Sequence, residues 1–166
     1  MKLLVFVLFL FLSVGCTKFL DSFDPNADTK QAKAEDQILN NLVEPQSAIL
    51  YSLDPEVPQA AEGFRGYKIL GEINLSPESI SEAALEFKDA ADGFKEDMPV
   101  LACFRPRVGI RVVKNQKRYD YLLSYECKHL IAYDGEKKFD FDAAGNPKNL
   151  NDILTTANIP VSQEKK

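Results

Sequence analysis

Residues 108–133, VGIRVVKNQKRYDYLLSYECKHLIAY, carry the clearest signal for the fold of this chain. They belong to two runs rich in β-branched and aromatic residues, at 100–113 and 118–133, which the polar segment Lys114–Lys117 separates. Two such runs on either side of a short polar loop predict a β-hairpin. When Lys114 is paired with Lys117, apolar side chains face one another across the two strands: Val112 and Tyr119, Ile110 and Tyr121, Val108 and Leu123.

The second run, 118–133, is expected to be one long strand with its odd-numbered face toward the core. Continuing the hairpin register places Cys103 opposite Lys128, on the wrong face. A one-residue bulge at Pro106 would bring Cys103 opposite Cys127, and directly opposed side chains are close enough for a disulfide. The alternative is that both cysteines are reduced and buried as small apolar groups.

Shorter signals on both sides of the hairpin extend the same sheet. Strands are expected at 48–53, 67–75 and 137–142, and helices at 77–92 and 147–157. The first helix has the clearest boundaries, because Ser76 can cap it, Pro77 is tolerated at its first position and Gly93 can end it. The resulting order, β-β-α-β-β-β-α, predicts an α+β fold, with an antiparallel sheet of about five strands covered by two helices.

Length and composition indicate one folded domain. The 166 residues fit a single domain, which we expect at 47–161 with a C-terminal tail at 162–166. The formal net charge of −5 argues against a mainly electrostatic nucleic-acid binder, because such proteins present a basic face. The single histidine, His129, excludes a metal site built from several histidines of one chain.

The N-terminus predicts export. Lys2 precedes an uninterrupted apolar run at 3–12, which is too short to span a bilayer but has the length of a signal-peptide core. Small residues at 13 and 15 then lead to Cys16. The segment resembles a bacterial lipoprotein signal, with residues 1–15 as the signal peptide. The alternative is an ordinary cleaved secretory signal.

The lipoprotein resemblance implies a membrane anchor on Cys16. This residue would become the first of the mature chain and carry a diacylglyceryl group on its sulfur and a fatty acyl group, such as palmitate, on its amine. Several acyl chains together give stable membrane attachment. Thr17, rather than an aspartate, follows Cys16, which resembles lipoproteins sorted to the outer membrane of Gram-negative diderms, on the periplasmic side.

Residues 16–46 are expected to be a tether between the anchor and the domain. The segment contains several charged residues and lacks strand character. A short helix is expected at 30–43, because Ala34, Ile38 and Leu42 recur on one stripe. An alternative interpretation of this stripe is a helix that binds a partner.

Two segments near the hairpin resemble a family of small bacterial lipoproteins of uncharacterised function. The first reads Cys-Phe-Arg-Pro-Arg-Val-Gly-Ile-Arg at 103–111, and the second reads Ser-Tyr-Glu-Cys at 124–127. The runs at 51–55 and 159–160 are also similar. The family often has a cysteine where Ser124 stands and a histidine where Val108 stands, so the resemblance does not bring a cluster of three thiols and a histidine to this chain. It also implies no particular activity.

Cys103, Cys127 and His129 are candidate residues for metal binding or thiol chemistry. The short spacing between cysteines that is typical of structural zinc is absent from the sequence. A half-buried core histidine is the alternative interpretation of His129.

A second candidate site is the arginine patch, formed by Arg105, Arg107 and Arg111 in an otherwise acidic protein. One interpretation is cross-strand pairing, with Arg107 near Ser124 and Arg105 near Glu126. The other is contact with an anion such as a carboxylate of the cell wall.

These observations favour a membrane-anchored binding or structural module of the bacterial cell envelope. The sequence has neither a phosphate-cradling glycine motif nor a nucleophile elbow, so we expect no enzymatic activity, cofactor or bound metal. The expected partner, beyond the membrane itself, is an envelope protein or the cell wall, and not a nucleic acid. The alternative is an envelope redox or metal-dependent protein, or an enzyme, that uses Cys103, Cys127 and His129.

Overall fold

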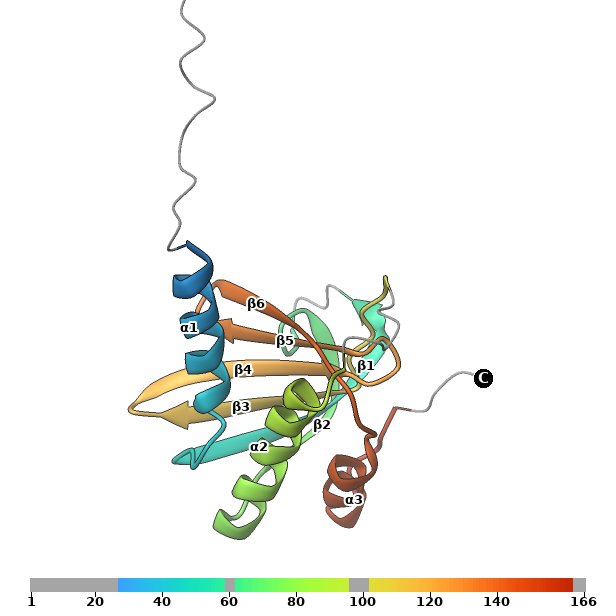
Figure 1. Ribbon diagram of the computed structural model, residues 1–166. Coiled ribbons are helices and arrows are strands. Elements are labelled where there is room, and N and C mark those ends of the chain that lie inside the picture. Colours follow the sequence, from blue (N-terminus) through green and yellow to red (C-terminus); the bar gives the residue numbers. More distant parts are fainter. Residues whose placement is uncertain (1–26, 59–61, 96–101, 163–166) are drawn as a thin grey trace, which may run out of the picture.

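The frame of the molecule is one antiparallel sheet of six strands in the order β2-β1-β3-β4-β5-β6 (Figure 1). The computed structural model describes residues 27–58, 62–95 and 102–162. Its elements are α1 (Ala27–Asn40), β1 (Ser47–Pro58), β2 (Tyr67–Asn74), α2 (Pro77–Asp92), β3 (Val108–Lys114), β4 (Lys117–Ser124), β5 (His129–Asp134), β6 (Lys137–Asp142) and α3 (Lys148–Thr156). The expected α+β class is confirmed.

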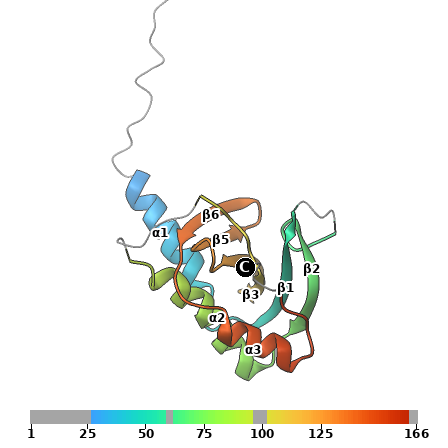
Figure 2. The ribbon, with the colours of Figure 1, turned by 90° about the vertical axis from the view of Figure 1, so that its right-hand side faces the viewer.

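The helices lie against one face of the sheet, which we call the helix face (Figures 1 and 2). α2 lies in the crossover from β2 to β3, so β3 pairs with β1 instead of with β2. The boundaries of α2 agree with the sequence, and the Ser79 backbone N–H donates to the Ser76 hydroxyl at 3.3 Å. The core between helices and sheet includes Leu50, Ile80, Phe87, Ile110, Tyr121, Leu123, Leu150 and Leu154.

The β3–β4 hairpin has the register expected from the sequence. Val108 pairs with Leu123, Ile110 with Tyr121, and Val112 with Tyr119. These residues all lie on the helix face, in the main core or packed against it. Alternation of apolar and polar residues, together with the polar loop, was therefore sufficient to specify this pairing.

Residues 118–133 do not form the single strand expected from the sequence. The chain turns at 125–128, between β4 and β5, and Lys128 takes a left-handed φ of 56°. The turn contains no glycine, proline or asparagine that would signal it. Because the strand reverses here, even-numbered residues of β5 lie on the helix face, where Ala132 pairs with Tyr121 and Leu130 with Leu123.

The residues before β3 are also not a strand. β3 begins at Val108, and residues 102–107 form an irregular segment that we call the strap. The expected bulge at Pro106 is therefore wrong, because Pro106 lies outside the sheet. Backbone N–H groups link the strap to the sheet: the Leu53 N–H donates to the Arg107 carbonyl at 2.8 Å, and the Arg105 N–H donates to the Ser124 hydroxyl at 3.1 Å.

β1 is longer than the sequence suggested. It continues through Asp54 and Pro55, where a stop was expected, and ends at Pro58. Its register with β2 shifts between Ser52 and Leu53 and again between Asp54 and Pro58. A proline is compatible with such an irregular stretch, because the ladder of hydrogen bonds is already interrupted there.

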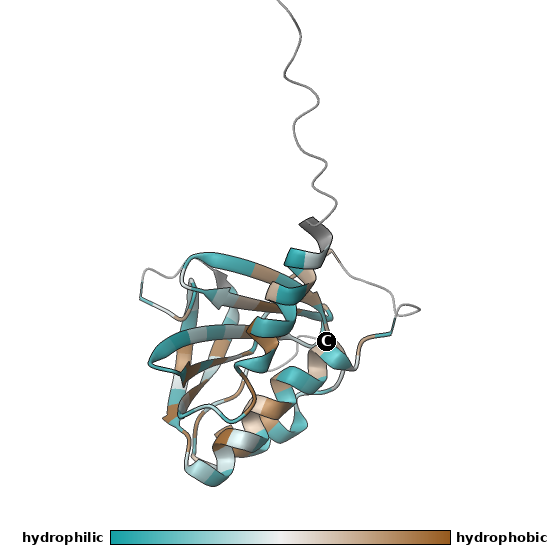
Figure 3. Ribbon diagram, turned by 60° about the vertical axis from the view of Figure 1, so that its left-hand side comes forward, coloured by the Kyte–Doolittle hydropathy of each residue, from teal (hydrophilic) through white to brown (hydrophobic). Residues whose placement is uncertain are grey.

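α1 belongs to the folded domain. Ile38 and Leu42 are buried in the main core, and the Tyr121 hydroxyl donates to the Ile38 carbonyl at 2.6 Å. The rest of α1 is largely hydrophilic (Figure 3). Residues 27–46 were expected to be part of a tether, and in the structure the buried side chains of Ile38 and Leu42 in this segment pack in the main core. The segment predicted to be a signal peptide, residues 1–15, and Cys16 lie outside the described residues.

Candidate functional site

The reverse face of the sheet carries a second, smaller hydrophobic cluster. Tyr51, Leu53, Phe64 and Leu122 are buried in it. The Phe64 ring stacks on the Tyr51 ring with a centroid distance of 4.2 Å and covers Gly109. A Cβ atom at Gly109 would lie 2.5 Å from the Phe64 ring, so glycine permits this close approach. The chain around Phe64 thus folds back over the reverse face.

A buried carboxylate lies beside this cluster. Asp120 accepts hydrogen bonds from Arg111 Nε at 2.7 Å, Arg111 Nη2 at 2.9 Å and Arg65 Nε at 2.7 Å. The hydrogen bonds with Asp120 raise the pKa of Arg111 above its usual range, which keeps the guanidinium charged. Arg65 also lies over the Tyr133 ring, 4.4 Å from its centroid. The three charged groups form one network.

The three arginines of the arginine patch form ion pairs with different carboxylates. Arg105 forms ion pairs with Glu56 and, at 3.8 Å, with Glu126. Arg107 pairs with Glu126 and hydrogen-bonds the Ser162 hydroxyl, and the expected position of Arg105 near Glu126 is confirmed. Arg111 lies apart from these two, on β3 with Asp120. Each member of the arginine patch therefore has an acidic partner.

Cys103 and Cys127 are joined in a disulfide, with their Cα atoms 5.4 Å apart. The two cysteines pair as predicted from the sequence, but the bulged strand that was expected to bring them together is not present. Cys103 is an exposed residue of the strap, and Cys127 is fully buried in the turn between β4 and β5. The disulfide therefore fastens the strap to a turn instead of bridging two extended strands.

His129 is close to this disulfide. It lines a cavity of about 330 Å³ together with Cys103, Phe104 and Ile131, and with Lys138 and Asp140 of β6. Its Nδ1 atom is 4.0 Å from the Asp142 carboxylate. Within residues 27–58, 62–95 and 102–162, no group of three or more histidine, cysteine or acidic side chains is arranged to hold a metal ion.

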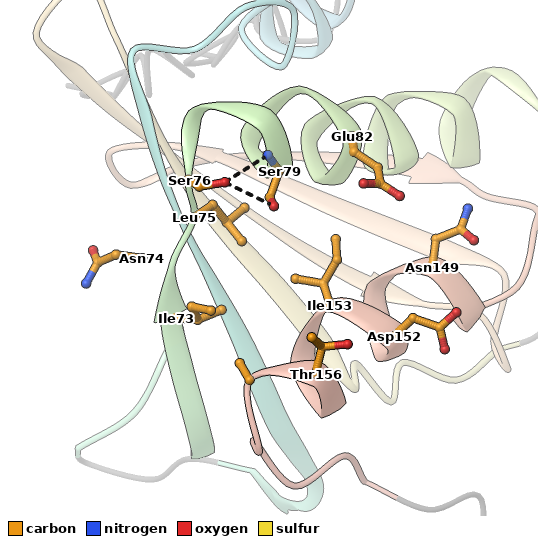
Figure 4. Close-up of a pocket in the computed structure, with 11 residues that line it drawn as sticks. Ile73, Asn74, Leu75, Ser76, Ser79, Glu82, Asn149, Asp152, Ile153 and Thr156 are labelled. Carbon is orange, nitrogen blue, oxygen red and sulfur yellow. Dashed lines mark hydrogen bonds between the residues drawn. The ribbon is translucent and has the colours of Figure 1, made fainter.

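A further cleft lies on the other side of the molecule, where α2 and α3 meet the end of β2 (Figure 4). It has a volume of about 510 Å³. Ile73, Leu75 and Ile153 give it apolar walls, and its polar rim consists of Asn74, Ser76, Ser79, Glu82, Asn149, Asp152 and Thr156. Sequence reasoning missed this site, because the polar residues of each helix have the pattern of an ordinary solvated face.

The rim of the cleft is acidic. Glu82 has no hydrogen-bond or ion-pair partner in the described part of the chain, and Asp152 forms an exposed pair with Lys148 at 2.6 Å. Glu86 stands behind the rim, where it accepts hydrogen bonds from Asn149 Nδ2 at 3.0 Å and from the Tyr125 hydroxyl at 3.3 Å. The Glu86 contacts connect α2 to α3 and to the β4–β5 turn. The cleft is therefore bounded by elements that are linked to one another.

Comparisons with known proteins identify no relative of this chain. No protein-family model, no curated protein and no solved structure matches it. No helix in the described residues is long and apolar enough to cross a membrane.

Proposed function

We propose that this protein is a lipid-anchored binding module of the bacterial cell envelope, and that it binds its ligand in the cleft between α2 and α3. The observation that carries the proposal is the cleft itself, a concave site with apolar walls and a few polar groups, as ligand sites generally have. The Gly15-Cys16 signal supports attachment to a membrane. The Cys103–Cys127 pair suits an oxidising compartment outside the cytoplasm.

The chemistry of the cleft favours an amphipathic ligand that carries an amine. The carboxylates of Glu82 and Asp152 line the rim, whereas no lysine or arginine lines the cleft. An ammonium group can pair with Glu82 while an attached apolar group contacts Ile73 and Ile153. Lysine-bearing segments of an envelope protein, or amine-bearing peptides of the cell wall, have this chemistry.

The test is an NMR titration of the full chain with N-acetyl-Leu-Lys amide. The expected result is that amide signals of residues lining the cleft shift, and that the neutral peptide N-acetyl-Leu-Gln amide binds more weakly. Glu82→Gln should weaken binding of the lysine peptide about three- to fivefold, the effect of a solvent-exposed ion pair. Asp36→Asn, which removes an exposed carboxylate on α1, is the matched control and should leave the affinity unchanged.

Three results would contradict the proposal. The first is that neither peptide shifts the signals of the cleft. The second is that both peptides bind equally well. The third is that Asp36→Asn weakens binding as much as Glu82→Gln, because the effect would then report total charge and not the cleft.

A redox role of the Cys103–Cys127 pair is the second candidate function. It is favoured by the exposure of Cys103 and by the cavity that Cys103 shares with His129. Cys127→Ser separates this role from a structural one. A structural disulfide predicts that the variant loses stability and retains peptide binding. Redox chemistry predicts that two equivalents of glutathione reduce the wild-type disulfide to two thiols and release one glutathione disulfide, whereas the variant keeps a stable fold and its single Cys103 thiol cannot complete this cycle. Retained peptide binding in an otherwise destabilised variant supports the binding module.

A further inference from the structure

A second cavity lies on the reverse face of the sheet, at the end where β1, β2, β3 and β4 run side by side. Its volume is about 260 Å³, and its lining includes Ser47, Ile49, Asn74, Arg111, Val113 and Arg118. The strand register brings these residues together, because Ile49 pairs with both Asn74 and Arg111, and Val113 pairs with Arg118. We call this space the arginine cavity.

The guanidinium of Arg111 is held in place by Asp120. Its Nε and Nη2 atoms donate to the two carboxylate oxygens, and Asp120 is in turn fixed by Arg65. A guanidinium has five N–H groups, so three of those on Arg111 remain available, two on Nη1 and one on Nη2. Arg111 is therefore a pre-oriented donor group at the wall of the arginine cavity.

Arg118 is the second cation of the cavity. It is an exposed residue that has no hydrogen-bond or ion-pair partner within residues 27–58, 62–95 and 102–162. It lies diagonally across the β3–β4 pair from Arg111, a separation that long side chains can bridge. Sequence reasoning assigned the arginine patch to Arg105, Arg107 and Arg111, and it missed Arg118.

The local charge balance is positive. The acidic groups near the cavity are Asp120, which Arg65 and Arg111 share, and Glu72, which acts electrostatically on Arg111. Arg65, Arg111 and Arg118 thus face two carboxylates, which leaves one positive charge in excess. The pKa of the neighbouring Tyr51 is raised by burial and by the charges of Glu72 and Asp120, while Arg111 and Arg118 act in the opposite direction.

We propose that the arginine cavity binds a small organic oxyanion, a carboxylate or a phosphate, between Arg111 and Arg118. The remaining N–H groups of Arg111 and the guanidinium of Arg118 would donate to the anion, since arginine pairs well with both kinds of oxyanion. Ile49 and Val113 supply an apolar surface for a short stem attached to the anion. This site shares only Asn74 with the lining of the α2–α3 cleft and takes a ligand of opposite charge.

The experiment titrates the full chain with two probes, N-acetylalanine for a peptide carboxylate and inorganic phosphate for a phosphate group. Side-chain NMR signals of the arginine Nε–H groups report where each probe binds. The signals of Arg111 and Arg118 should shift with at least one probe. Arg118→Gln should weaken that binding about tenfold or more, as expected for loss of a charge-assisted hydrogen bond.

Arg105→Gln is the matched control, because it removes the same charge from an arginine that already pairs with Glu56 and Glu126. It should leave the affinity unchanged. Tighter binding of N-acetylalanine than of phosphate would identify a carboxylate ligand, and the reverse order would identify a phosphate ligand.

The proposal is overturned if neither probe shifts the signals of Arg111 and Arg118, or if Arg118→Gln and Arg105→Gln weaken binding equally. Its failure is distinguishable from failure of the proposed function, since the lysine peptide is read out at the cleft and the anions are read out at the arginine side chains.

Discussion

Asp120 is the residue on which the polar network of the reverse face depends. Its side chain is only 3 % exposed, and it accepts hydrogen bonds from both Arg65 and Arg111. A buried carboxylate is costly unless cations and hydrogen bonds compensate it. Here two arginines do so from the solvent side, while Tyr133 and Phe64 cover their guanidinium groups.

The first prediction concerns Asp120→Asn. This change leaves two arginines without their anion, and we expect it to lower the free energy of unfolding by about 2–3 kcal/mol, measured by urea titration. Asp140→Asn breaks an exposed pair with Lys138 and should change stability by less than about 0.5 kcal/mol. Equal effects of the two substitutions would show that the Asp120 network contributes no more than a surface pair.

The second prediction concerns Cys16. Its position after small residues at the end of an apolar run motivates the lipid anchor. Metabolic labelling with a fatty-acid analogue should mark the wild-type protein and leave Cys16→Ala unmarked, and the variant should leave the membrane fraction. Equal labelling of both proteins would rule out acylation at this residue.

Among the elements, α2 has a cap that can be tested by itself. The Ser76 hydroxyl accepts from the Ser79 N–H, and Pro77 begins the helix. The third prediction is that Ser76→Ala lowers the free energy of unfolding by about 1 kcal/mol. Ser81→Ala, at an exposed position inside the same helix, should not lower it. If both substitutions had the same effect, the serine hydroxyl at the N-terminus would not act as a cap.

The strap depends on its disulfide. The fourth prediction is that the mature protein, alkylated without prior reduction, gains no label at Cys103 or Cys127 by intact mass spectrometry. The two cysteines are 24 residues apart, so in the chain-entropy model reduction should cost roughly 3 kcal/mol of stability. Two alkylated thiols in the untreated protein would show that the pair is reduced and that the strap is held by its hydrogen bonds and ion pairs alone.

The boundary of the domain is a property of the whole molecule. Leu42 follows α1 and is fully buried in the main core, so this part of the chain contributes to the fold. The fifth prediction is that Leu42→Ala lowers the free energy of unfolding by about 2–5 kcal/mol. Lys33→Ala, on the exposed side of α1, should have almost no effect. If Leu42→Ala left the free energy of unfolding unchanged, this segment would not contribute to the fold and would be a tether.

The whole molecule presents ligand-sized cavities of opposite character on the two sides of its sheet. The α2–α3 cleft has an acidic rim, and the arginine cavity is basic. Asn74, at the end of the edge strand β2, lines both. Sequence analysis did not identify either cavity, although it did include Arg111 among its candidate residues. Each cavity is assembled from elements that are distant in the sequence, so no local pattern marks it.

Features that depend on interactions between neighbouring residues could be predicted from the amino-acid sequence. It specified α2 through Ser76 and Pro77, and it specified the β3–β4 register through alternation around a polar loop. These features are local, because capping and pairing across a short loop involve side chains a few positions apart.

The β4–β5 turn, the docking of α1, the α2–α3 cleft and the arginine cavity depend on contacts between distant parts of the chain. The turn at 125–128 has no turn-forming residue, and the apolar alternation continues through it, so no local signal separates β4 from β5. The buried disulfide partner Cys127 and the burial of strands on both sides stabilise it instead. The stripe of α1 became core because α1 packs against β5, next to α2. Long-range packing outweighs local preference at such places. The free energy gained by removing apolar side chains from water is larger than the small differences in backbone propensity.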